Sequence, residues 1–440
     1  MKTYKWNEMS RADKARLLRR SETDIQAIIE QVKPIVEDVR LNGDAAVLRW
    51  TEKFDGVALN RNKLKATKEE FASAGKKLPK AVRAAIDKAA TNVHAYHERQ
   101  LPQSLWMTPV ETGVYAGEKI TPVASIGLYV PRGKGAFPSV MVMLGAPAVV
   151  AGVKKIVVVT PPGPDGEVDA ATLYAAQACG VKDIYRVGGV QAVAALAFGT
   201  AKIPKVDKIL GPGSSYVTAA KRILYGMVDV GLPAGPSESI ILADEYADPE
   251  LVANDLLIEQ EHGPDSTALL VTHSSALIKK VAARVPALIA KLPAKRREFI
   301  NKGFAGFGGA VLTKSLRQSV DFVNEFAPEH LEVLTVDPFD TLGKLKNAGE
   351  ILLGQDTPIT LGNFNLGVNA ILPTGGFARS YSGVSIFDFL KRSSIGFVSK
   401  QGFDSLAPTA ETLARYEGFP AHAAAVAVRR KRYAKNIKSK

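Results

Sequence analysis

Short β-rich runs alternate with longer helix-compatible stretches through most of this chain, and this alternation constrains the fold more than any other feature. The β-rich runs lie at residues 155–160, 183–187, 239–243, 268–272 and 310–313. Such alternation is typical of parallel sheets covered by helices. A chain of 440 residues is also too long for one compact core. The pattern therefore predicts an α/β protein with at least two domains.

The two ends of the chain follow different patterns. Apolar residues recur at helical spacing from residue 23 to 41, which predicts an amphipathic helix bent at Pro34 and ended by Asn42 and Gly43. The residues before it are expected to form a separate N-terminal arm. Residues 80–99 predict a second helix. After about Gly383 the pattern predicts a mostly helical C-terminal piece with a basic tail.

Composition excludes several classes of protein. The chain is 46% hydrophobic and 23% charged, which is ordinary for a globular protein. Its longest apolar stretch, residues 137–153, is rich in Ala, Gly and Pro and too short to span a bilayer, so we expect no membrane partner. Residues 1–20 lack the apolar core of a secretory signal, which indicates a cytoplasmic protein. Cys179, the single cysteine, is expected to be buried.

The formal net charge of +13 raises the question of a nucleic-acid partner. Its distribution argues against one, because much of the surplus lies in the C-terminal tail and the rest is scattered. The basic residues of that tail are Arg429, Arg430, Lys431, Arg432, Lys435, Lys438 and Lys440. We therefore expect no nucleic-acid binding.

Glycine-rich turns join the predicted strands to the helices, at residues 188–189, 211–213 and 235–236. None of them forms a G-x-G-x-x-G sequence after a strand, so the usual dinucleotide-binding fingerprint is absent. The alternation is compatible with a Rossmann-like topology, but a claim of cofactor binding cannot rest on that motif.

The chain has only six histidines, which narrows the search for chemistry. We expect His94, His97 and His273 to be surface residues. The other three lie beside carboxylates, and each of these contexts is considered next.

Glu259 and His262 are three residues apart on a helix face and could bind one metal ion, although a solvated helix end is the simpler alternative. Glu329 and His330 follow Pro328 on a stiff turn, where the imidazole could act as a base near neutral pH. The alternative there is an exposed turn.

Glu417 and His422 lie in the C-terminal piece and could equally form an interdomain contact. The sequence of residues 362–374 predicts a glycine-rich loop, and its periodicity does not indicate a functional site.

Taken together, these segments resemble the histidinol dehydrogenase family over roughly residues 25–429. The motifs that carry the resemblance lie at residues 127–131, 185–192, 203–207, 211–213, 234–238, 327–332, 372–374, 382–385 and 417–422. So many motifs in one order are specific for the family but much less so for the substrate.

The resemblance implies a fold with two Rossmann-like parallel-sheet domains, one inserted in the other, and small N- and C-terminal helical pieces. It places the N-terminal arm at residues 1–23 and the first domain at 24–135 and 238–382. It places the inserted NAD-binding domain at 136–237. Residues 383–440 would form a C-terminal piece that is swapped across a homodimer, so that His422 completes the partner's site.

Members of the family oxidise an amino alcohol to the carboxylate in two NAD-dependent steps and use zinc to position the substrate. By resemblance, Tyr129, Gln191 and Ser214 would contact NAD, although Ser214 stands where the family usually has Asn.

The same resemblance assigns the catalytic and substrate-binding residues. Ser237 and Glu417 match substrate contacts. Glu329 and His330 match the catalytic pair: His330 would take the alcohol proton as hydride leaves, and Glu329 would activate water at the aldehyde stage.

The zinc ligands depart from the family's Gln, His, Asp and His. The matching residues are Glu259, His262, Asn363 and His422, so Gln has become Glu while Asp has become Asn. The set still carries one negative charge, two imidazoles and oxygen donors, and we therefore expect one zinc ion per chain. The opposing hypothesis is a vestigial site with a solvated Glu259.

Two further departures concern the substrate. Ala370 replaces a histidine that helps to hold the substrate, and Arg132 replaces a glycine. Losing an imidazole and gaining a cation predicts a small hydroxylated metabolite other than histidinol, oxidised by way of an aldehyde. The alternatives are a genuine histidinol dehydrogenase and a catalytically inactive structural homologue.

Overall fold

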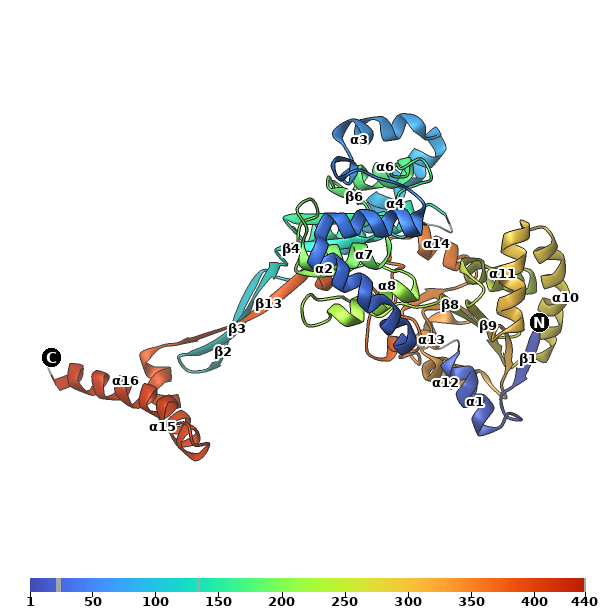
Figure 1. Cartoon of the computed structure of the whole chain (residues 1–440). Helices are drawn as coiled ribbons and strands as arrows, with labels where there is room; N and C mark the ends of the chain where they lie inside the picture. The colour runs from blue at the N-terminus through green and yellow to red at the C-terminus, as the bar shows by residue number, and fades with distance from the viewer. Residues whose placement is uncertain (21–24, 133–134, 439–440) are drawn as a thin grey trace. The chain divides into compact units, whose positions relative to one another are not determined.

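The computed structural model describes residues 1–20, 25–132 and 135–438, and the chain divides into two compact units (Figure 1). Unit 1 comprises Met1–Leu101 and Val123–Phe389, and unit 2 comprises Pro102–Pro122 and Leu390–Lys440. Unit 1 contains two parallel sheets with helices packed on them, which confirms the α/β class. No helix in the described part of the chain is long and apolar enough to cross a membrane.

The larger sheet of unit 1 has six parallel strands in the order β1-β10-β9-β8-β11-β12. Their bounds are β1 (Lys2–Lys5), β8 (Glu238–Ala243), β9 (Thr267–Thr272), β10 (Gly309–Leu312), β11 (His330–Leu334) and β12 (Glu350–Leu353). The central strands β8, β9 and β11 are buried along their whole length, as parallel strands covered on both faces must be.

Alternate residues along the strands of this sheet pack into two separate hydrophobic cores, one on each face. Ile241 and Leu270 pack on one face with helices α9 (Pro249–Ile258), α10 (Ser275–Ala290) and α11 (Ala294–Ala305). Ile240 and Leu269 pack on the other face with α1 (Arg11–Arg19) and α12 (Leu316–Phe326). The N-terminal arm is therefore part of this layer, since it supplies both the edge strand β1 and helix α1.

The smaller sheet has four parallel strands in the order β6-β5-β4-β7. They are β4 (Ser125–Tyr129), β5 (Lys155–Thr160), β6 (Ile184–Arg186) and β7 (Lys208–Leu210). The helices that follow or accompany them are α2 (Ile25–Asp55), α4 (Lys80–Glu98), α5 (Pro138–Val150), α6 (Ala170–Ala178), α7 (Gly189–Phe198) and α8 (Ser215–Leu224).

Helix α2 and strand β4 belong with this smaller sheet, whereas the sequence prediction placed residues 24–135 in the other domain. Val32 and Val36 of α2 share one core with Leu196 of α7 and Val217 of α8. The sequence prediction started the inserted domain at residue 136, just before α5. Strand β4, which precedes that helix, pairs with β5 and therefore belongs to the same sheet. The predicted boundary at residues 23–24 lies outside the described residues.

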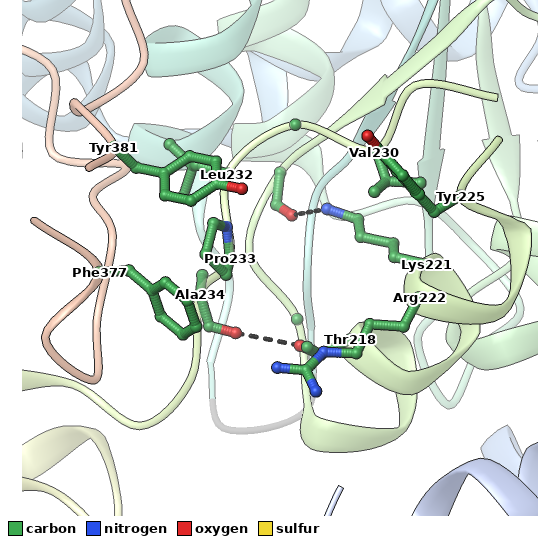
Figure 2. Close-up of a pocket in the computed structure, with 13 residues that line it drawn as sticks. Thr218, Lys221, Arg222, Tyr225, Val230, Leu232, Pro233, Ala234, Phe377 and Tyr381 are labelled. Atoms are coloured by element: carbon green, nitrogen blue, oxygen red, sulfur yellow. Dashed lines mark hydrogen bonds between the residues drawn. The ribbon is translucent and has the colours of Figure 1, made fainter. Parts of the chain in front are cut away.

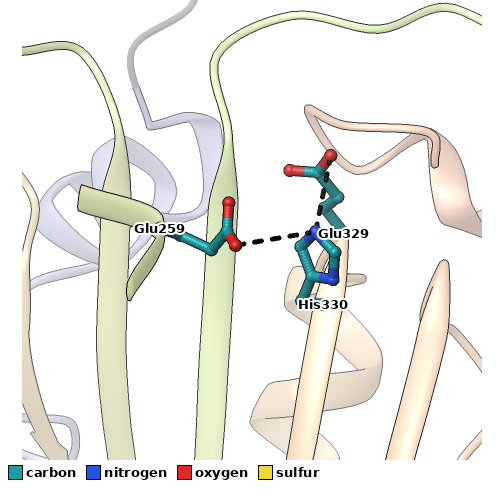
Figure 3. A group of neighbouring side chains, drawn as sticks. All are labelled: Glu259, Glu329 and His330. Atoms are coloured by element: carbon teal, nitrogen blue, oxygen red, sulfur yellow. Dashed lines mark ion pairs between the residues drawn. The ribbon is translucent and has the colours of Figure 1, made fainter. Parts of the chain in front are cut away.

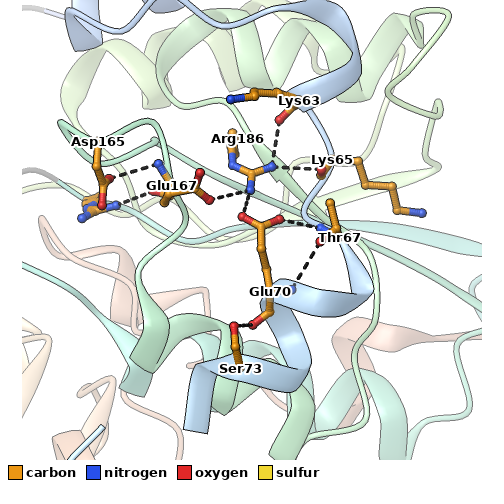
Figure 4. A network of polar contacts seen from close by, with 9 residues as sticks. Lys63, Lys65, Thr67, Glu70, Ser73, Asp165, Glu167 and Arg186 are labelled. Carbon is orange, nitrogen blue, oxygen red and sulfur yellow. Dashed lines mark hydrogen bonds and ion pairs between the residues drawn. The ribbon is translucent and has the colours of Figure 1, made fainter. Parts of the chain in front are cut away.

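A buried arginine ties residues 61–74 to the edge of the smaller sheet (Figure 4). The Arg186 guanidinium donates to the carbonyls of Lys63 and Lys65 at 2.8 and 2.9 Å, and it pairs with Glu70 and Glu167. Glu70 also closes a capping box with Thr67 at the start of α3 (Lys68–Ala74). This network fixes a segment that has few apolar side chains.

Unit 2 consists of an antiparallel sheet and two helices. Strand β3 (Val114–Pro122) pairs with β2 (Leu105–Glu111) and with β13 (Leu390–Val398), and the chain continues into α15 (Lys400–Tyr416) and α16 (Pro420–Lys438). The expected helical piece after residue 383 therefore begins with a strand. Most of β13 is exposed, so it lacks the apolar alternation that marks a half-buried strand.

One expectation from the sequence is wrong: His97 is fully buried rather than on the surface, and its Nδ1 lies 2.7 Å from the Val93 carbonyl oxygen. The predicted end of the first helix is confirmed, since Gly43, with φ +51°, divides α2 into two helical parts. Pro34 lies within the helix and Gly43 supplies the left-handed backbone that separates its two parts. Cys179 is buried, as expected.

We expect Phe322→Ala to lower the free energy of unfolding of unit 1 by about 3–5 kcal/mol. Phe322 is 1% exposed, and its ring packs edge-on against Trp6 with centroids 4.9 Å apart. The substitution therefore leaves a cavity that loosens the contact between the N-terminal arm and α12. Phe339→Ala, at a side chain 73% exposed, is the control and should change stability by less than about 0.5 kcal/mol in chemical denaturation.

Candidate active site

The first residues of three neighbouring strands bring acidic side chains and one imidazole together at one edge of the larger sheet. Glu238 begins β8, His330 begins β11 and Glu350 begins β12, and Glu329 immediately precedes β11. Because parallel strands start at the same edge, residues far apart in sequence meet there. All four of these side chains are at most 8% exposed.

His330 lies between two carboxylates at this edge (Figure 3). Its Nε2 is 3.8 Å from Oε1 of Glu329 and 4.0 Å from Oε1 of Glu259, which lies at the end of α9 and is 1% exposed. One ligand atom from each of these residues fits within 4.8 Å of the others. The predicted catalytic pair and one predicted metal ligand therefore form a single buried cluster.

The other predicted metal ligands of unit 1 contact Glu259 directly. His262 Nε2 is 3.5 Å from Glu259 Oε2, and the Asn363 amide donates to Glu259 Oε1 at 2.9 Å from helix α14 (Ile359–Phe364). In the described part of the chain no lysine or arginine pairs with Glu259. A buried carboxylate without a cationic side chain, surrounded by imidazole and amide groups, fits a metal ion.

Burial and mutual repulsion control the charges in this cluster. Burial raises the pKa of Glu329 to about 8, with a further rise from the charge of Glu259 and an opposing effect of His330. Burial lowers the pKa of His330, but the nearby carboxylates Glu259, Glu329 and Glu350 outweigh it and bring that pKa to about 10. The cluster is therefore short of positive charge, and a cation bound beside Glu259 would offset the carboxylates and favour the neutral form of His330.

A strained turn presents Glu329 and His330 to the site. Helix α12 ends at Phe326, and Ala327 then takes a left-handed conformation with φ +53°, which is unfavourable for a residue with a Cβ. Pro328 follows and leads into Glu329. The Arg20 guanidinium holds this turn by donating to the Phe326 carbonyl at 2.7 Å. The structure thereby compensates for the strain at a functional position.

Arg20 and Glu238 are site residues that sequence reasoning missed. Arg20 Nε lies 2.7 Å from Glu238 Oε2, and both side chains are almost fully buried. The Glu238 backbone N–H in turn donates to Glu329 Oε2 at 2.9 Å. Burial raises the pKa of Glu238 to about 7 despite the adjacent Arg20. Arg20 is separated from Glu238 by more than 200 positions, so no local pattern could have connected them.

The predicted NAD contacts lie in the smaller sheet, at the edge where its strands end, whereas the acidic cluster lies where strands of the larger sheet begin. Tyr129 is the last residue of β4, and its hydroxyl accepts the Gly189 N–H at 3.0 Å at the start of α7. Gln191 lies in the first turn of α7 and is fully buried, yet neither polar atom of its side chain has a hydrogen-bond partner among the described residues. Such unsatisfied groups fit contact with a polar ligand.

Ser214 caps helix α8, beside a cavity of about 290 Å³ (Figure 2). The cavity is lined by the glycines of the 211–213 turn, by Lys221 and Arg222, and by aromatic side chains including Tyr381. Lys221 is buried and donates to the Gly211 carbonyl at 2.5 Å, and none of the described residues that line the cavity is a carboxylate. Burial lowers the pKa of Lys221 to about 8.

The remaining predicted site residues are less well connected. Ser237 lines a small hollow with Arg20 and Glu238, next to the catalytic turn. Ala370 is half-buried in a loop after α14. Glu417 and His422 are exposed residues of unit 2, and their predicted roles in substrate and metal binding stay predictions.

Comparison with known proteins identifies the family. A family model described as histidinol dehydrogenase matches residues 18–430. The chain belongs to the histidinol dehydrogenase family. A histidinol dehydrogenase of Synechocystis sp. is 53% identical over 410 residues, covering 93% of this chain and 94% of the relative. A histidinol dehydrogenase homolog of Rhizobium meliloti is 48% identical over 433 residues, covering 98% and 95%.

The fold agrees with the family. The crystal structure of histidinol dehydrogenase from Elizabethkingia anophelis superposes with a TM-score of 0.92 at 34% identity, and the match covers 98% of both chains. Enzymes of the histidinol dehydrogenase family are NAD-dependent oxidoreductases that act on CH–OH donors and use zinc. The sequence prediction of the enzyme class and of both cofactors is therefore confirmed.

We expect the purified enzyme to contain about one zinc ion per chain and Glu259→Ala to lower that content below a tenth. The substitution removes a buried carboxylate that both His262 and Asn363 contact. Glu261→Ala, two residues along the same segment, is the matched control and should retain the metal. Elemental analysis of both variants after dialysis checks this, and normal zinc in Glu259→Ala would mean that the ion is held elsewhere.

Proposed function

We propose that this protein oxidises histidinol to histidine in two NAD-dependent steps, with Glu329 and His330 as the catalytic pair. The observation that carries the proposal is the buried cluster of Glu259, Glu329 and His330 with His262 and Asn363 beside it. It occurs in a chain that is 53% identical, over nearly its full length, to a relative named histidinol dehydrogenase.

The expectation of a different substrate finds no support in these comparisons. That expectation rested on the loss of an imidazole at Ala370 and on the cation of Arg132. The Arg132 guanidinium donates to the Glu167 carbonyl oxygen at 3.1 Å, so at least part of its hydrogen-bonding capacity is used within the chain. The site itself is rich in carboxylates, which favours a cationic amino alcohol over an anion.

The chain's own residues account for the proton steps. His330 Nε2 faces the cluster and would take the hydroxyl proton of the alcohol while hydride leaves its carbon. Glu329 would then remove a proton from the water molecule that attacks the aldehyde to form its hydrate. When bound, NAD would supply the hydride acceptor for each step and zinc would supply the Lewis acidity that holds the substrate. Glu259, His262, Asn363 and the partner subunit's copy of the C-terminal histidine would hold the metal.

The location of NAD is part of the proposal. Tyr129, Gln191 and Ser214 all lie where strands of the smaller sheet end, which is the usual place for ligands in open α/β sheets. Lys221 and Arg222 give the neighbouring cavity two cations and no acid, which suits the negatively charged diphosphate of the cofactor.

A homodimer with a swapped C-terminal piece is supported by the surface of unit 2. Its strands and helices expose large apolar side chains, which single-chain proteins seldom leave in solvent. Val110, Leu413, Tyr416 and Val428 are each between 60% and 90% exposed. A cytoplasmic location stays a prediction from the sequence.

The test is NADH formation at 340 nm with histidinol and with a panel of other primary alcohols, polyols and hydroxy acids. We expect histidinol to give the highest kcat/KM and two NADH per molecule consumed. Several relatives, at 44–50% identity, carry the name histidinol dehydrogenase homolog. A higher kcat/KM for another alcohol would therefore reject histidinol as the substrate and leave the chemistry of the site in place.

We expect Glu329→Gln to slow the aldehyde step by about 10²- to 10⁴-fold while the alcohol step changes much less. In the wild type, the rate from the aldehyde should rise with pH, reach half its maximum near pH 8 and level off above that, because burial brings the pKa of Glu329 to about 8 and only its carboxylate can act as base. The rise should vanish in the variant. Equal losses in both steps would instead place Glu329 in substrate binding.

A further inference from the structure

A third carboxylate, Glu350, contacts the imidazole of His330 on the side away from Glu259 and Glu329. Glu350 Oε2 lies 2.8 Å from His330 Nδ1, whereas the two other carboxylates approach Nε2. Glu350 is 7% exposed. We propose that Glu350 is a positioning residue that fixes the ring orientation of His330 and keeps its proton on Nδ1. The inference deepens the proposed function, since it rests on His330 acting as the base.

The register of the larger sheet delivers Glu350 to this position. Strands β11 and β12 are parallel, and His330 pairs with Glu350 as the first residue of each strand. The Glu350 N–H donates to the Glu329 carbonyl at 3.0 Å, and the Gly349 N–H donates to the Pro328 carbonyl at 2.9 Å. Neighbouring residues in register point to the same face of a sheet, so the two side chains meet. Backbone hydrogen bonds thus place His330 and Glu350 side by side independently of the contact between their side chains.

The surrounding space confines the carboxylate. A Cβ atom on Gly362 of α14 would lie 2.5 Å from Glu350 Oε1, so a larger residue at this position would force the carboxylate to shift. Glu350 Oε1 has no hydrogen-bond partner, and Oε2 is committed to His330. Within the described part of the chain, the contact with the imidazole is therefore the one polar interaction of this side chain. Its burial is costly unless it serves His330.

The consequence for His330 follows from the chemistry of the two groups. A carboxylate can only accept a hydrogen bond, so Nδ1 must carry the proton. Nε2 is then left with its lone pair when the ring is neutral, and it faces Glu329, Glu259 and the space where the alcohol would bind. The same arrangement, a carboxylate behind the ring and a free nitrogen in front, orients histidine bases and histidine metal ligands in many enzymes.

The structural test reads the tautomer without any substrate. The zinc-loaded protein is labelled with ¹³C and ¹⁵N in histidine only, and magic-angle-spinning NMR assigns each ring nitrogen. With six histidines in the chain, His330→Asn identifies the signal of interest. We expect the neutral ring of His330 to be protonated at Nδ1 in the wild type and to become a mixture of tautomers in Glu350→Ala. An Nε2–H ring in the wild type, or no change in the variant, would overturn the proposal.

The kinetic test separates positioning from folding. We expect Glu350→Ala to lower kcat with histidinol by about 10²- to 10⁴-fold while KM changes less than about threefold, because the substrate does not touch Glu350. Glu350→Asp keeps the charge and should recover part of the lost rate.

Leu352→Ala is the control for the kinetic test, since it removes a buried side chain from the same face of the same strand. It should lower stability yet leave kcat within about threefold. An equal loss of kcat in Glu350→Ala and Leu352→Ala would mean that Glu350 has only a structural role. If the wild type fails to oxidise histidinol, the proposed substrate fails, but the NMR result still decides the role of Glu350.

Discussion

The active site depends on burying several negative charges next to one imidazole. Glu259, Glu329 and Glu350 all approach His330 and are all removed from water. Carboxylates that are held together in a medium of low dielectric constant repel one another and resist ionisation, as the raised pKa of Glu329 shows. Such an arrangement is tolerable only where positive charge is supplied. His330 supplies some of it, a metal ion fits beside Glu259, and a cationic substrate suits the remainder.

The scaffold satisfies this constraint with backbone geometry. The starts of β8, β11 and β12 fix the spacing of the acidic residues, and the Arg20 guanidinium stabilises the turn that carries Glu329. The proposed cofactor residues lie at the other edge, where β4 and β7 of the smaller sheet end. A hydride donor and its acceptor could thereby be held by two rigid sheets, with the buried acidic cluster on one of them.

Sequence reasoning predicted the features that repeat along the chain. Strands β5, β6, β8, β9 and β10 stood out because buried parallel strands are continuous apolar runs. The pairs Glu259–His262 and Glu329–His330 stood out because their members are close in sequence. Strand β13 was missed because it is exposed and lacks that signal. Arg20, Glu238 and Glu350 were missed because only strand register and helix packing bring them to the site. The buried His97 shows the same limit, since a polar helix face can still pack inside.

The position of Arg20 has a consequence for synthesis on the ribosome. The residue that stabilises the catalytic turn is made about 300 residues before the carbonyl it contacts, and strand β1 precedes its partner β10 by a similar distance. At roughly 5–20 residues per second, the N-terminal segment has to wait on the order of 15–60 s for its binding partners. Its charged and polar composition, rather than an apolar one, suits a nascent segment that must stay solvated during that interval.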